Sequence, residues 1–163
     1  MNQIYNRKPF NPSLHEENDP ICRDLIKSYL NKNIPSMDFR DNPDIYGIDL
    51  QGYYKKQNDI PVMGIELARL NSWQGNIDTY PYPLYTLYDR KKRYFDTINN
   101  TSWLIIIRSD LKRMIIAQGK DIYNYINDDN VKIMTMKDGC GGYREEKAYL
   151  IPIEIFITKN IIL

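Results

Sequence analysis

The sequence has few of the residues that most often build metal centres and disulfides. It contains two cysteines, Cys22 and Cys140, and one histidine, His15. Neither cysteine has a metal-ligand spacing, so we expect both to be reduced thiols in an intracellular protein. A single histidine in a polar segment is typical of a surface residue, because histidine metal ligands occur in clusters.

Long apolar runs are also missing. The apolar stretches 104–107 and 161–163 are far too short to span a bilayer, and residues 2–7 are too polar for a signal peptide. We therefore expect a soluble, cytoplasmic protein that has no membrane partner.

An excess of charge of one sign is absent, with 22 Lys and Arg against 21 Asp and Glu. Any interaction with nucleic acid must therefore rest on a local basic patch. The glycines of 138–142 match neither a Walker nor a Gly-x-Gly-x-x-Gly spacing and predict a turn. At 163 residues the chain is predicted to be one domain, 1–163, in which 1–18 form an irregular lead-in.

The pattern of apolar residues predicts both helices and strands. Asp19-Pro20 is a helix start, and the apolar positions that follow from 21 to 30 have helical spacing. The continuous apolar run within 102–108 predicts a strand buried on both faces, and 131–136 alternate as a half-exposed strand does. This order predicts an α/β (α+β) domain with a mixed central β-sheet flanked by helices.

Two segments, 43–50 and 62–69, predict a hairpin in which each arm carries one carboxylate between aliphatic residues. These carboxylates are Asp49, in Ile-Asp-Leu, and Glu66, in Ile-Glu-Leu. Antiparallel pairing would bring the two acids together, and Mg²⁺ or Mn²⁺ with oxygen ligands would relieve their repulsion. Asp44 competes with Asp49 for this role. We prefer Asp49, because its aliphatic neighbours match those of Glu66, and interpret Asp44 as a strand-start or turn residue.

The hairpin resembles the core of the PD-(D/E)XK nuclease superfamily, in which an Asp and a Glu on adjacent strands hold Mg²⁺. The resemblance implies a restriction-endonuclease-like core and a metal-dependent endonuclease that hydrolyses DNA phosphodiester bonds. It would act in the host cell cytoplasm if the chain is phage-encoded. Further residues are similar to those of small phage and prokaryotic members: Trp73, Tyr80-Pro81, Arg90-Lys91 and Tyr94-Phe95.

Ala68 departs from the family pattern, which has a lysine two residues after the Glu. Three explanations stay open. Lys91 or Lys92 replaces the missing catalytic lysine from a neighbouring helix; or the chain is inactive because a lysine was changed to alanine; or it is a degenerate member that binds DNA or a protein partner without cleavage.

A run of four cations, 90–93, opens a helix predicted over 90–98 with Asp89 as its N-cap. Cations are unfavourable at a helix N-terminus, so Arg90, Lys91 and Lys92 are predicted to face either neighbouring acids or the phosphates of DNA. Trp73 is predicted either to stack on a base or to fill a gap beside the sheet. Cleavage of two strands would favour a homodimer.

Overall fold

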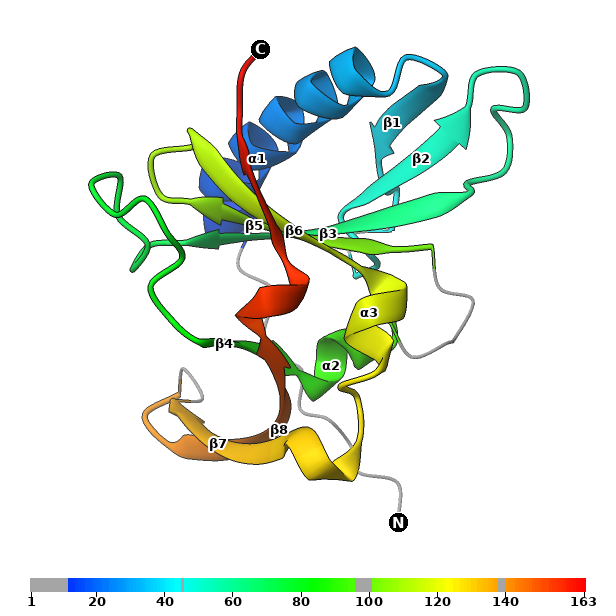
Figure 1. Ribbon diagram of the computed structural model, residues 1–163. Coiled ribbons are helices and arrows are strands. Elements are labelled where there is room, and N and C mark those ends of the chain that lie inside the picture. Colours follow the sequence, from blue (N-terminus) through cyan, green and yellow to red (C-terminus); the bar gives the residue numbers. More distant parts are fainter. Residues whose placement is uncertain (1–11, 45, 96–100, 138–139) are drawn as a thin grey trace.

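The computed structural model describes residues 12–44, 46–95, 101–137 and 140–163 (Figure 1). A six-stranded sheet has the order β1-β2-β3-β5-β6-β9, and a three-stranded sheet has the order β4-β8-β7. Strands β3 and β5 run parallel, whereas the other pairs of these two sheets are antiparallel. The predicted α+β class with a mixed central sheet is confirmed. The helices are α1 (Pro12–Asn33), α2 (Asp89–Lys92) and α3 (Gly119–Tyr123), with 3-10 turns η1 (Asp128–Asn130) and η2 (Ile153–Ile155); the strands are β1 (Met37–Asp41), β2 (Leu50–Tyr54), β3 (Met63–Leu70), β4 (Leu84–Tyr88), β5 (Trp103–Arg108), β6 (Arg113–Gln118), β7 (Val131–Lys137), β8 (Tyr143–Pro152) and β9 (Ile157–Asn160).

Helix α1 is longer than the sequence pattern indicates. It begins at Pro12, and Pro20 lies inside it. The prediction of a start at Asp19 was wrong, because a proline that fits a first helical position can also lie within a longer helix at the cost of one hydrogen bond. Of the predicted irregular lead-in, 12–18 are helical and 1–11 lie outside the described residues. Within the described part of the chain, no helix is both long enough and apolar enough to cross a membrane.

Strand β5 forms the centre of the fold, as its continuous apolar run predicts. Leu104, Ile105, Ile106 and Ile107 have no exposed surface. Ile105 and Ile107 belong to the core that α1 covers, whereas Leu104 and Ile106 belong to a second core on the opposite face of the sheet. This division follows from the side-chain period of two in a strand.

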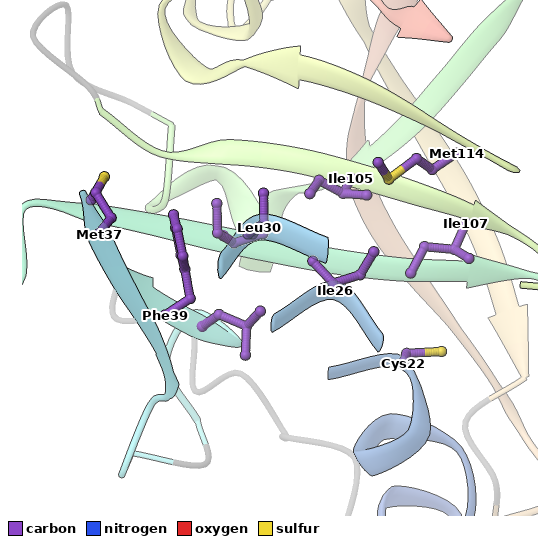
Figure 2. Packing of buried hydrophobic residues seen from close by; sticks show 10 residues of the cluster. Cys22, Ile26, Leu30, Met37, Phe39, Ile105, Ile107 and Met114 are labelled. Atoms are coloured by element: carbon purple, nitrogen blue, oxygen red, sulfur yellow. The ribbon is translucent and has the colours of Figure 1, made fainter. Parts of the chain in front are cut away.

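The first core lies between α1 and the six-stranded sheet. Figure 2 shows Ile26 and Leu30 of α1 against Ile105 of β5, with Phe39 of β1 beside them. The second core lies on the other face, where β4, β8, α2 and α3 are found (Figure 1). Its fully buried side chains include Leu87 and Tyr149. The fold therefore has three layers, with the mixed sheet in the middle.

The strand pattern differs from the prediction at two places. The predicted hairpin exists as β2 and β3, which pair antiparallel with Leu50 opposite Ile65, but its first arm covers 50–54 instead of 43–50. The edge strand β1 was missed, although 37–41 alternate apolar and polar residues. Of the predicted helix 90–98, residues 90–92 belong to the four-residue α2, which starts at Asp89 and has no side-chain cap; 93–95 form a turn, and 96–98 lie outside the described residues.

Candidate active site

The position of Glu66 follows from the alternation of side chains along β3. Ile65 and Leu67 pack into the core beneath α1. Ala68 packs into the second core. Glu66 lies on the same face of β3 as Ala68, because the two residues are two positions apart. Glu66 is only 3% exposed. The predicted orientation, with aliphatic neighbours on one side and the acid on the other, is confirmed for β3.

Asp49 lies directly before β2 and reaches the same point of the sheet. Continuing the Leu50–Ile65 register by one residue puts Asp49 opposite Glu66. Its Oδ2 accepts a hydrogen bond of 2.8 Å from the backbone N–H of Leu67. The chain before Leu50 does not follow strand alternation, since Ile48 packs on the Glu66 face of β3, at Gly64, while Leu50 lies in the core under α1.

Asp44 has a different role. It is exposed, and its carboxylate accepts the N–H of Tyr46 while its carbonyl accepts the N–H of Gly47. The turn is tight, because a Cβ atom at Gly47 would lie 2.5 Å from the side-chain nitrogen of Asn42. These contacts agree with the interpretation of Asp44 as a turn residue and leave Asp49 as the acid beside Glu66.

Lys91 brings an ammonium group to this site from α2, which packs against β4 and β8. Its Nζ donates a hydrogen bond to Glu66 Oε1, and the two groups form an ion pair. Lys92 points elsewhere, with its Nζ 5.8 Å from the ring centroid of Tyr149. Of the two lysines that could replace a side chain at Ala68, Lys91 is therefore the one in contact with Glu66.

Burial dominates the electrostatics of Glu66. Burial first, and the charge of Asp49 second, raise the pKa of Glu66 to about 7, although the Lys91 ammonium opposes this rise. Burial is the largest influence on Lys91 and would lower its pKa, but the charge of Glu66, its hydrogen bond and the charge of Asp49 together outweigh burial, so that the pKa of Lys91 is raised. The second carboxylate oxygen, Glu66 Oε2, is buried and has no hydrogen-bond partner among the described residues.

Sequence reasoning missed Tyr85 of β4. Burial, and then the negative charge of Glu66, raise the pKa of its hydroxyl. Alternation along β4 could have assigned Tyr85 and Leu87 to one face, since both pack into the second core. Its place near Glu66 depends on how the smaller sheet covers the larger one, which strand periodicity does not contain.

The other predicted nucleic-acid contacts divide into two groups. Arg90 remains 47% exposed while its Nη1 forms a 2.8 Å ion pair with Glu146, so the cation run faces acids at least in part. Trp73, in contrast, is fully buried, and its Nε1 donates a 2.8 Å hydrogen bond to the carbonyl of Ile77. Of the two roles predicted for Trp73, the structure shows the second, because the indole ring fills the second core instead of facing solvent.

The acids of this site fit Mg²⁺ by the chemistry of their donor atoms. Asp49 and Glu66 supply two hard carboxylates, and the unpartnered Glu66 Oε2 is a ligand atom without a competing protein donor among the described residues. No group of three or more His, Cys, Asp or Glu side chains that could hold a metal occurs within the described parts of the chain. Two carboxylates fit Mg²⁺, which is commonly bound by one or two of them together with water and substrate phosphates.

Comparisons with protein families and curated proteins found no match, whereas a comparison with solved structures found a similar fold. No protein-family model and no curated protein sequence matches the chain. Among solved structures, the chain is similar to D212, a nuclease from a fusselovirus, with a TM-score of 0.47 and 17% sequence identity over 93% of this chain and 88% of that one.

Proposed function

We propose that the chain is a metal-dependent nuclease that hydrolyses phosphodiester bonds in DNA. The observation that supports this most strongly is the group formed by Asp49, Glu66 and Lys91. Two carboxylates and one lysine converge from three separate segments, although burial of the carboxylate of Glu66 is costly. A buried carboxylate that has a perturbed pKa and contacts a lysine is typical of catalytic sites.

Each residue has a role in this proposal. Asp49 and Glu66 would hold Mg²⁺ or Mn²⁺, and the bound cation would supply Lewis-acid chemistry for phosphodiester hydrolysis. Lys91 supplies positive charge for the developing phosphorane and a donor to orient the attacking water, the role that the family pattern gives to a lysine at position 68. The chain is then active despite Ala68.

A second candidate function is binding of DNA or a protein without cleavage. The observation that favours it is the ion pair itself, because the Lys91 ammonium already neutralises Glu66 in the way that a metal ion would. Because Lys91 already compensates the charge of Glu66, the folded protein would not require a bound metal ion for its stability. The two functions differ in metal binding and in turnover.

The first experiment is incubation of supercoiled, linear and branched DNA with Mg²⁺ or Mn²⁺. The proposal predicts cleavage by the parent protein and a loss of about 10²-fold or more in Glu66→Gln and Lys91→Ala, as for other acid–base and charge-stabilising groups. The control Lys159→Ala removes an exposed lysine on β9 and should cleave as the parent does. No cleavage of any DNA substrate would leave the binding function.

The second experiment is a metal titration followed by thermal unfolding. A cation that binds only the folded state raises the melting temperature in a saturable way. We expect this rise with the parent and not with Glu66→Gln, while the exposed-residue control Glu154→Gln should keep it. A rise that survives in Glu66→Gln would remove Glu66 from the metal site, and no rise in the parent would contradict metal dependence.

A further inference from the structure

The segment that carries Asp49 is attached to the segment that carries Lys91. Asp49 follows Tyr46 by three residues, and the carbonyl of Tyr46 accepts hydrogen bonds from two side chains just beyond α2. The Tyr94 hydroxyl donates one at 3.0 Å, and Arg93 Nη2 donates the other. Arg93 Nη2 also lies 3.0 Å from the Tyr94 hydroxyl, so the three groups form one network.

Tyr94 contacts both Lys91 and the segment 46–49 that leads to Asp49. Its ring centroid lies 5.8 Å from Lys91 Nζ, three residues earlier in the chain, in the range of a cation–π contact. The backbone N–H of Tyr94 bonds to the carbonyl of Lys91 at 3.1 Å, and the next residue, Phe95, is fully buried in the second core. The ring is therefore held close to Lys91 while the hydroxyl reaches the segment 46–49.

We propose that Tyr94 is a positioning residue, whose hydroxyl fixes the segment 46–49 so that Asp49 stays in register with Glu66 and Lys91. The hydrogen bond from the Leu67 N–H to the carboxylate of Asp49 reports on this register. If the segment moves away from α2, we expect this bond to weaken. The catalytic consequence rests on the proposed function, whereas the structural consequence rests on the hydrogen bonds of Tyr46, Tyr94 and Asp49.

The test compares Tyr94→Phe, which removes the hydroxyl and keeps the ring, with Tyr143→Phe, a matched change at an exposed tyrosine of β8. Amide hydrogen exchange of Leu67 is the structural readout. We expect exchange of this amide to become about fivefold faster in Tyr94→Phe, the effect of losing one hydrogen bond, with no change in Tyr143→Phe. The amides of Ile105 and Ile106 in β5 should exchange at the parent rate.

The kinetic readout is DNA cleavage with Mg²⁺. A misplaced Asp49 should lower kcat by about tenfold and leave KM unchanged, since substrate contacts are kept while the reacting geometry is not. Arg93→Gln, which removes the second donor to Tyr46, should change Leu67 exchange in the same direction.

Two results would overturn the proposal. One is Leu67 exchange in Tyr94→Phe within twofold of the parent. The other is an equal acceleration at Ile105 and Ile106, which would show a loss of stability throughout the fold. If the parent cleaves no DNA but Leu67 exchange rises locally, the proposed function fails while the positioning by Tyr94 stands.

Discussion

Glu66 should make the stability of this protein fall as the pH rises from about 4.5 to about 7. Its pKa is raised from an ordinary value of 4.5 to about 7 in the folded protein, mainly by burial. The folded state therefore binds this proton more tightly than the unfolded chain does. The free energy of unfolding loses this contribution progressively from about pH 4.5 to about pH 7, and the full penalty is present above that range.

The magnitude follows from the difference between the two pKa values. Each factor of ten in proton affinity corresponds to about 1.4 kcal/mol, so a rise from 4.5 to about 7 corresponds to a penalty of about 3 kcal/mol at pH 8. Glu66→Gln replaces the carboxylate by a neutral group of the same shape. We expect the variant to match the parent at pH 4.5 and to exceed it by about 3 kcal/mol at pH 8, where the carboxylate is charged.

The measurement is urea unfolding of both proteins at several pH values in the presence of EDTA, because a bound cation would stabilise the charged form of Glu66. Glu154→Gln serves as the control, since this carboxylate is exposed, and should differ from the parent by less than about 0.5 kcal/mol throughout. A difference between Glu66→Gln and the parent that changes by less than about 1 kcal/mol from pH 4.5 to pH 8 would refute the reasoning.

Two further predictions concern the lysine and the cation run. Ala68 lies on the same face of β3 as Glu66, so a lysine at position 68 should bring an ammonium group to the site. Adding Ala68→Lys to the Lys91→Ala variant should therefore raise its cleavage rate by about 10²-fold or more. A double variant as inactive as Lys91→Ala alone would contradict this. Neutralising Arg90 and Lys92 should weaken DNA binding and reduce the slope of log K against log salt by about one to two, whereas Lys159→Ala should keep the parent slope. Equal slopes in all proteins would mean that the run is only solvated.

The carboxylate pair was predictable because its position depends on local geometry. Because side chains alternate along β3, Glu66 lies on the face of the strand opposite to that of Ile65 and Leu67. Antiparallel pairing with β2 then brings Asp49 beside it, even though the first arm of the hairpin was predicted over the wrong residues. The buried strand β5 was predictable for a similar reason, since an apolar run of its length needs cover on both faces.

The function of the cations was not predictable from their charge. The charges predicted that these cations face acids or phosphates, but not which partner each one meets. In the short α2, Arg90 pairs with Glu146 and Lys91 with Glu66, whereas Lys92 lies over the ring of Tyr149. Trp73 is a similar case, because the sequence alone leaves a buried ring and a base-stacking ring equally consistent with its neighbours. Its complete burial results from the smaller sheet packing over the larger one.

The sequence by itself determined which residues share a face of each strand, because that depends on backbone geometry within a few residues. Only the tertiary structure decided that Lys91, and not Lys92, meets Glu66, and that the hydroxyl of Tyr94 reaches the carbonyl of Tyr46. The ion pair joins residues 25 positions apart, on a strand and a helix that touch only because β4 and β8 carry α2 toward the central sheet. Contacts of this kind depend on how separate elements pack, and the order of residues within either element does not contain that information.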